Sequence, residues 1–132
     1  MNSPGWRWIG SASVLAIHDE QIAEHGGMPG LRDESLLLSA LARPQNLAAY
    51  DEPDIAGLAA YAVGIARNHP FLDGNKRTAW VVAEIFLLKN GYELIASDGD
   101  GVRAMLAVAD GSMLEPDFAA WLRSNLTPYQ AG

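Results

Sequence analysis

Residues 69–88 read HPFLDGNKRTAWVVAEIFLL. The second half of this stretch is apolar on nearly every side, and only Glu84 interrupts it. A helix of that kind is surrounded by other helices rather than lying on a surface. The stretch therefore predicts a central buried helix over about Asn75–Asn90, which Gly91 stops.

The rest of the chain predicts an all-α fold of about six helices packed around that central helix. Apolar residues recur at helical spacing, and signals such as Gly26-Gly27 and Pro29-Gly30 separate the segments. The first helix starts near Val14, after a cap at Ser11 or Ser13, and ends at Gly26-Gly27. The other predicted helices are Glu34–Ala42 (capped by Asp33), Pro53–Arg67, Gly101–Ala109 and Pro116–Asn125. Asp98-Gly99-Asp100-Gly101 lacks the Lys-Ser/Thr ending of a phosphate-binding loop and is predicted to be a turn.

The segment Arg43–Glu52 shows no helical stripe, and Pro44 is expected to close the preceding helix. It predicts a loop or short extended flap of about ten residues, a length that is often functional. The segment would admit a short β-hairpin, and a plain connector is the alternative. We expect one domain over residues 13–126, an N-terminal arm over 1–12 and a C-terminal tail over 127–132.

Composition favours an ordinary globular protein: 49% of the 132 residues are hydrophobic and 19% are charged. The net charge of −7 makes general nucleic-acid binding a poor hypothesis, because that function needs a basic surface. The absence of cysteine excludes disulfides and thiolate metal sites. The first ten residues lack an apolar signal core, and the longest apolar run is too short to span a bilayer, so we predict a cytoplasmic protein without membrane contact.

The start of the central helix predicts an anion site. A helix N-terminus presents unpaired N–H groups and a partial positive charge, and phosphate is its usual occupant. Gly74 allows the backbone to approach a phosphate closely. Lys76 and Arg77 add two positive charges where the helix dipole disfavours them, so a bound polyanion is expected there. Each of these residues alone has an ordinary explanation, but together they favour a functional site.

Two neighbouring side chains add chemistry to this site. Asp73 is a hard carboxylate beside the expected phosphates, the usual arrangement for Mg²⁺. His69, at the end of the preceding helix, is a candidate general base. Phe71 is expected to anchor the loop in the core while Pro70 fixes its direction.

The remaining aromatic and histidine residues are interpreted as structural. Trp80 and Trp121 are expected in the core rather than as platforms for a nucleotide base. Trp6 and Trp8 would either pack the N-terminal arm on the domain or mark a contact surface. His18 and His25 are expected at the surface of the first helix or as capping groups.

The stretch His69–Ala79 strongly resembles the motif of the Fic/Doc (Fido) superfamily, and most closely its death-on-curing branch. Further segments resemble that branch, and the resemblance covers roughly residues 13–125. These segments are Leu15–His18, Gly26–Asp33, Ser39–Gln45 and Ala59–Gly91. The resemblance implies a single Fic/Doc-type helical domain.

Lys76 and Trp80 distinguish between branches of that superfamily. Adenylyl-transferring members usually have Gly in place of Lys76 and a second Arg in place of Trp80. The resemblance therefore implies the other chemistry, in which ATP binds in the reverse orientation and its γ-phosphoryl group passes to a Thr hydroxyl. The expected function is that of a toxin of a toxin–antitoxin system, an ATP–Mg²⁺-dependent protein kinase that modifies elongation factor Tu and arrests translation.

The resemblance assigns a role to each loop residue. His69 would deprotonate the target hydroxyl, and Asp73 would orient Mg²⁺. The nucleotide phosphates would be bound by Gly74, Asn75, Lys76 and Arg77, with Arg77 also counted as catalytic. The predicted flap would dock the target chain through Arg43, Pro44, Gln45, Asn46 and Tyr50.

The resemblance also implies an antitoxin whose C-terminal segment folds as a helix in a groove near the active site. The sequence contains no Ser/Thr-x-x-x-Glu inhibitory helix, which favours control by a separate chain. Two alternatives remain at this stage: a Fic-type protein adenylyltransferase or other nucleotidyltransferase, and a non-enzymatic module that binds nucleotide or a partner.

Overall fold

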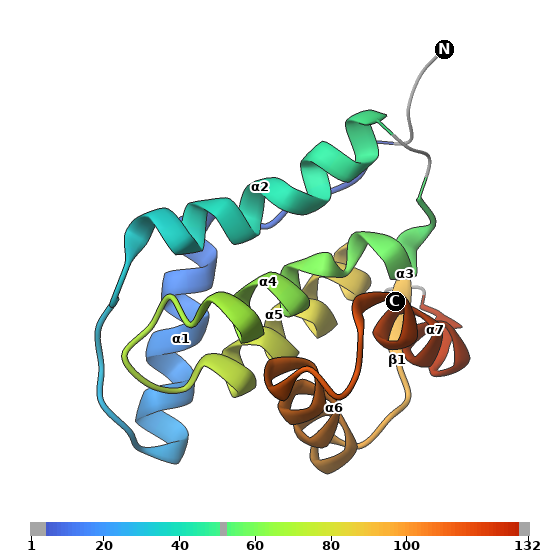
Figure 1. Ribbon diagram of the computed structural model, residues 1–132. Helices are drawn as coiled ribbons and strands as arrows, with labels where there is room; N and C mark the ends of the chain where they lie inside the picture. Colours follow the sequence, from blue (N-terminus) through green and yellow to red (C-terminus); the bar gives the residue numbers. More distant parts are fainter. Residues whose placement is uncertain (1–4, 51–52, 130–132) are drawn as a thin grey trace.

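The helix predicted from the quoted stretch is α5, Asn75–Lys89, and it lies among the other helices (Figure 1). We describe the fold from a computed structural model that covers residues 5–50 and 53–129. Eight of the α5 side chains are buried, including Thr78, Trp80 and Phe86. The prediction of a central buried helix is confirmed. Its end also agrees, since Asn90 is the C-cap.

The described residues form six further helices, of which α1, α4 and α6 pack directly on α5. Helix α4 lies between α2 and α5, while α1 and α6 contact α5 on other sides (Figure 1). The mostly helical architecture predicted from the sequence is therefore confirmed. The bounds of these helices are α1 Ser11–His25, α2 Glu34–Tyr50, α3 Ile55–Leu58, α4 Ala60–Asn68, α6 Asp98–Asp110 and α7 Glu115–Ser124.

The strands lie elsewhere than the sequence suggested. Strand β1, Tyr92–Leu94, follows α5 and pairs antiparallel with β2, Leu126–Pro128. The pairing joins residues far apart in the chain, with Glu93 opposite Thr127. The β-hairpin that the sequence would admit in the segment 43–52 is not present in residues 43–50, because these residues are helical.

Pro44 does not end α2, so the prediction of a loop over Arg43–Glu52 is wrong for residues 43–50; residues 51 and 52 lie outside the described part of the chain. A proline inside a helix removes one hydrogen bond and costs about 3 kcal/mol. Packing offsets that cost here: Pro44 is buried, and Ala48, one turn later, packs against the core. The apolar contacts of α2 with α4 thus override a local breaker.

Three other boundaries differ from prediction. Helix α1 begins at Ser11 with Gly10 as its N-cap, so the start expected near Val14 and the cap expected at Ser11 or Ser13 are wrong. The helix expected over Pro53–Arg67 is divided at Ala59 into α3 and α4, and Asp54 caps α3 through the N–H of Gly57. The predicted turn at Asp98–Gly101 is instead the first turn of α6. The hydroxyl of Ser97 accepts the Asp100 N–H at 3.1 Å, and acidic residues favour a helix N-terminus.

Both ends of the described chain attach to the end of α5. Trp8 stacks on Phe86 with ring centroids 5.9 Å apart, which confirms that the arm packs on the domain. The N–H of Arg7 donates to the side chain of Asn90 at 2.9 Å. On the other side, the N–H of Tyr129 donates to the carbonyl of Gly91 at 2.9 Å.

Within the described residues, no helix combines the length and the apolar character needed to cross a membrane.

Helix α6 packs so closely on α5 that Gly101 has no room for a side chain. A Cβ atom there would lie 2.1 Å from the Trp80 ring. We expect Gly101→Ala to destabilise the protein by about 1–3 kcal/mol through overpacking, measured by urea unfolding. Gly99→Ala in the same turn is the control, because its nearest contact would be an Arg103 side-chain atom at 3.7 Å. Equal stability of the two variants would contradict the packing argument.

Candidate active site

The loop between α4 and α5 is held by the segment that precedes α2. Leu31 forms an isolated antiparallel bridge with Phe71. The carbonyl of Pro70 accepts the N–H groups of Arg32 and Asp33, at 2.7 and 3.0 Å. These contacts fix the backbone of the loop from outside.

Asn75 and Phe71 fix the same loop from inside. The Phe71 ring is 1% exposed, which confirms its predicted anchoring role. The amide oxygen of Asn75 accepts the Phe71 N–H, and the amide nitrogen donates to the Phe71 carbonyl, both at 3.0 Å. The amide oxygen and one N–H of the amide are occupied in this way, and the backbone N–H of Asn75 belongs to the first turn of α5. Its phosphate-binding role stays a prediction.

His69 forms the left-handed C-cap of α4, with φ 50° and ψ 56°. Its carbonyl accepts a hydrogen bond from Arg32 Nε at 2.7 Å, which stabilises this uncommon conformation. Partial burial lowers the pKa of His69 below its ordinary value, and the charges of Lys76 and Arg32 lower it further. The imidazole is therefore held neutral near pH 7, which is the form that can accept a proton.

Asp73 lies where the loop meets α1. Its carboxylate accepts the Gly74 N–H at 2.9 Å through one oxygen and the Met28 N–H at 3.2 Å through the other. A Cβ atom on Gly27 would lie 2.7 Å from this carboxylate, so the turn after α1 encloses it closely. The carboxylate is oriented by the backbone on two sides.

The donor set around Asp73 fits Mg²⁺ better than a metal that needs a protein cage. In the part of the chain that the structure describes, no group of three or more His, Cys, Asp or Glu side chains could hold a metal ion. Mg²⁺ is commonly held by one or two carboxylates together with substrate phosphates and water. Asp73, beside the predicted anion site, would supply one such carboxylate.

The start of α5 has the features of an anion site. Gly74 is its N-cap in a left-handed conformation with φ 75°, and neither a side-chain cap nor an acidic residue occupies the first turn. Lys76 is half-buried and Arg77 is exposed in this turn. A concentration of positive charge with no acidic side chain in the turn favours an anionic ligand.

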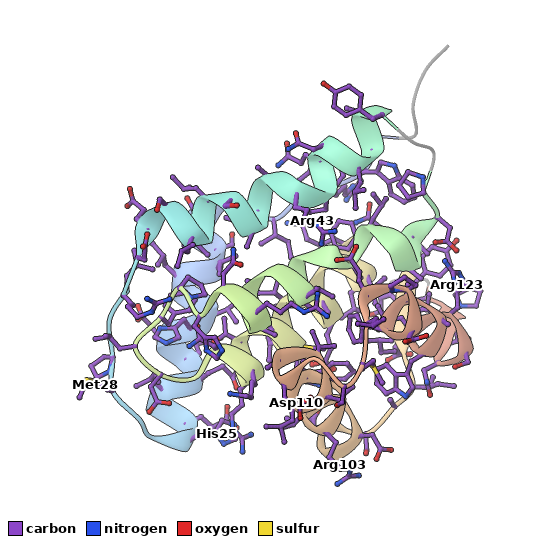
Figure 2. All side chains as sticks on the ribbon, viewed as in Figure 1. His25, Met28, Arg43, Arg103, Asp110 and Arg123 are labelled. Carbon is purple, nitrogen blue, oxygen red and sulfur yellow. The ribbon has the colours of Figure 1, made fainter. Side chains whose placement is uncertain are left out.

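A groove runs from this helix start between α1 and α6. It consists of two adjoining pockets of about 230 and 200 Å³ that share Gln21, His25, Arg77 and Val102. His25 extends from the end of α1 near the groove (Figure 2). Five predicted site residues line the first pocket, whereas His69 is not part of either lining. The five are Asp73, Gly74, Asn75, Lys76 and Arg77.

The far end of the groove is acidic. Glu84 is half-buried there, and Asp98 lies in the same lining. Burial, followed by the charge of Asp98, raises the pKa of Glu84 to about 7. The groove therefore changes from positive at Lys76 and Arg77 to acidic at its other end.

His18 was wrongly predicted to lie at the surface or to cap the first helix. It is 1% exposed and contacts both Phe71 and the backbone of Asp73. The periodicity contained a signal for this placement, since His18 follows buried Val14 by four residues and so shares its helix face. Trp80 is buried as predicted, and Trp121 packs partly buried against the same core.

The predicted flap residues do not lie on a loop. Arg43, Pro44, Gln45, Asn46 and Tyr50 all belong to α2, whose first turn, not its last, adjoins the loop that contains His69. Arg43 forms an ion pair with Glu115 of α7. Their role in docking a target stays a prediction, and the extended flap on which that role was based is absent from residues 43–50.

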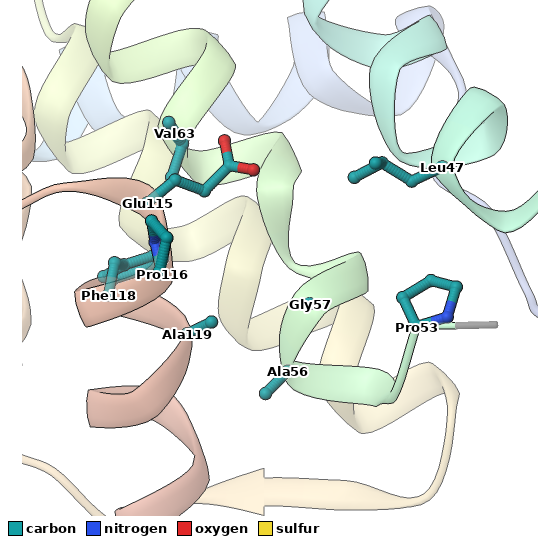
Figure 3. Close-up of a pocket in the computed structure, with 9 residues that line it drawn as sticks. All are labelled: Leu47, Pro53, Ala56, Gly57, Val63, Glu115, Pro116, Phe118 and Ala119. Atoms are coloured by element: carbon teal, nitrogen blue, oxygen red, sulfur yellow. The ribbon is translucent and has the colours of Figure 1, made fainter. Parts of the chain in front are cut away.

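A separate apolar pocket of about 210 Å³ lies between the end of α2, α3 and α7 (Figure 3). Leu47 and Pro53 line one side and Phe118 the other. Its one ionisable lining residue, Glu115, already pairs with Arg43. This pocket offers no group for catalysis, so the groove at α5 is the candidate active site.

Comparison with known proteins identifies the family of the chain. The Fic/DOC family matches residues 8–87, which include the loop and most of α5, and the chain belongs to that family. It is 39% identical over 93 residues to "Protein kinase doc" of Escherichia phage P1, covering 69% of this chain and 74% of that protein. It is 46% identical over 84 residues to "Toxin Doc" of Mycolicibacterium smegmatis, covering 60% of this chain and 62% of that protein.

The Asn75 clamp gives a first prediction for the site. Asn75→Ala leaves the buried N–H and C=O of Phe71 without partners, so we expect a loss of about 1–3 kcal/mol per group in the free energy of unfolding. Urea unfolding measures the loss. Asn46→Ala, on the exposed side of α2, is the control and should change stability by less than about 0.5 kcal/mol. Similar values for the two variants would mean that the clamp contributes little.

Glu84 gives a second prediction, which depends on pH. Its pKa is about 7 in the folded protein and near 4.5 in the unfolded chain. Between these values the folded protein binds more protons, so this group lowers stability as pH rises from about 4.5 to about 7, and the loss is constant at higher pH. We expect Glu84→Gln to raise Tm relative to the parent chain at pH 8 but not at pH 4.5. A difference in Tm that is the same at both pH values would contradict the raised pKa.

Proposed function

We propose that this protein is a Doc-type toxin that transfers the γ-phosphoryl group of ATP to a threonine hydroxyl of a target protein. Elongation factor Tu is the proposed target, and arrest of translation is the proposed effect. The main support is the set of groups at the start of α5: backbone N–H groups, Lys76 and Arg77, with Asp73 alongside. The names of the two similar proteins, one a kinase and one a toxin, point the same way.

The buried position of Trp80 supports phosphoryl rather than adenylyl transfer. Adenylyl-transferring members of the superfamily usually carry an arginine at this position. Here the indole is 2% exposed, packs at a tilt against Trp121 and donates to Asp98 at 3.4 Å. The groove therefore has an indole where those enzymes have a cation for the far phosphates. The positive charge of the groove is concentrated one turn earlier in α5, at Lys76 and Arg77.

The proposed reaction follows from these groups. His69 accepts the proton of the target hydroxyl, and the hydroxyl oxygen attacks the γ-phosphorus. The bond from that phosphorus to the β,γ-bridging oxygen breaks, and ADP leaves. Lys76, Arg77 and the first N–H groups of α5 stabilise the charge that develops on the phosphoryl oxygens. Asp73 would hold Mg²⁺, which when bound neutralises phosphate charge.

An antitoxin chain is the proposed partner. Its C-terminal segment would fold as a helix in the groove between α1 and α6. The lining supports an amphipathic segment, because Ile22, Val81 and Val102 supply apolar contacts between the charged ends. Coexpression with the product of a short neighbouring reading frame should relieve growth arrest.

Purified protein incubated with ATP–Mg²⁺ and elongation factor Tu tests the proposal. We expect a phosphate mass increment on a threonine, abolished by His69→Ala because that variant lacks the proposed general base. Arg77→Ala should lower the rate by about a hundredfold or more through lost charge stabilisation. Intact-protein and peptide mass spectrometry measure both.

Arg103→Ala is the matched control for Arg77, because Arg103 lies exposed on α6 and pairs with Asp100. It should leave the rate unchanged. An AMP increment in place of phosphate would overturn the kinase assignment and make the protein a nucleotidyltransferase. Absence of any transfer would favour a binding module.

A further inference from the structure

His18 is a buried imidazole between α1 and the loop that carries the proposed catalytic groups. Among the residues that the structure describes, the buried polar side chains are His18, Asn75 and Thr78. The ring of His18 lies parallel to that of Phe71, with centroids 3.8 Å apart and planes 6° apart. Burial of a polar ring is unfavourable unless it is hydrogen-bonded, so its partner is informative.

That partner is the backbone carbonyl of Asp73, 2.7 Å from Nε2 of His18. A carbonyl oxygen only accepts, so Nε2 must carry the proton and donate it. The N–H of Gly74 belongs to the same peptide group as this carbonyl, and it donates to the Asp73 carboxylate at 2.9 Å. His18 therefore holds the peptide that joins the proposed Mg²⁺ carboxylate to the N-cap of α5.

The contact also sets the distance between α1 and the start of α5. A Cβ atom on Gly74 would lie 3.6 Å from His18 Nε2 and 3.2 Å from Ile22 Cδ1. Gly74 has φ 75°, which backbone contacts must maintain. Ile22 lines the groove on the α1 side, while Lys76 and Arg77 line it on the α5 side. A shift at His18 would change both the direction of the Asp73 carboxylate and the width of the groove.

We propose that His18 is a positioning residue for the transfer reaction, an inference that rests on the proposed function. Its Nε2–H fixes the peptide between Asp73 and Gly74, so that the carboxylate, the N–H groups of α5 and the α1 wall of the groove face one bound nucleotide. Its stacking on Phe71 contributes to packing, and its hydrogen bond contributes to geometry. The two contributions can be separated by substitution.

Three variants of the full chain separate them. His18→Phe keeps a flat aromatic ring but cannot donate, His18→Gln keeps an N–H donor at similar reach but cannot stack, and His18→Leu loses both. We expect kcat with ATP–Mg²⁺ and elongation factor Tu to fall about tenfold to a hundredfold in the Phe and Leu variants, the size of effect that a misplacement near 1 Å produces. The Gln variant should recover most of that rate. The Kd for ATP–Mg²⁺ should be higher for the Phe and Leu variants than for the Gln variant.

Val14→Ala is the control for stability alone, since Val14 is fully buried one turn earlier on the same helix face and has no place in the groove lining. It should lower Tm while leaving kcat unchanged for the folded protein. The positioning role is overturned if the Gln variant is no faster than the Leu variant. It is also overturned if all His18 variants keep the parent kcat, or if their rates fall only with the fraction folded.

The parent protein serves as the separate test of function. If it transfers no phosphate, the proposed function fails, and the His18 inference is judged by the Kd for ATP–Mg²⁺ alone. In that case weaker binding by the Phe and Leu variants than by the Gln variant supports positioning, and equal binding by all three overturns it.

Discussion

The pair of hydrogen bonds between the Asn75 side chain and the Phe71 backbone is the constraint on which the site depends. It joins the first residue of α5 to the middle of the preceding loop, and the buried Phe71 ring joins both to the core. Because α5 is itself surrounded by α1, α4 and α6, the N-terminal end of the helix is fixed by the packing of the whole domain. Packing in the hydrophobic core thereby holds the polar groups of the site in fixed positions.

The parts of the fold and site that could be predicted from the sequence are those determined locally. The apolar run after Arg77 indicates a surrounded helix by its composition alone, whatever it packs against. The helix start at Gly74, with Lys76 and Arg77 in its first turn, also lies where the local sequence predicts it. The expectation of an anion there rests on the electrostatics of a helix N-terminus, which are the same in any fold. Phe71 had to be buried because a loop beside a charged site needs an apolar anchor.

The parts that could not be predicted depend on contacts between distant segments. Pro44 is a local helix breaker, and only the packing of α2 on α4 shows why the helix continues through it. The role of His18 requires knowing that α1 lies against a loop 55 residues later in the chain. The contact between the Asn75 amide and the Phe71 backbone likewise depends on tertiary geometry that the sequence does not show. Local chemistry thus indicates the candidate site residues. The contacts that each of these residues makes depend on the tertiary structure.

Asn90 and Gly91, at the far end of α5, bind the backbone of Arg7 on one side and of Tyr129 on the other. Helix α5 has 15 residues and so separates these attachments from the candidate site by roughly 22 Å. Polypeptide fused before Arg7 or after Tyr129 would leave the domain at the end opposite the groove. At either position, a fused tag, reporter or surface tether would thus leave the approach of nucleotide and target unobstructed. A short linker that joins the two positions would cyclise the domain.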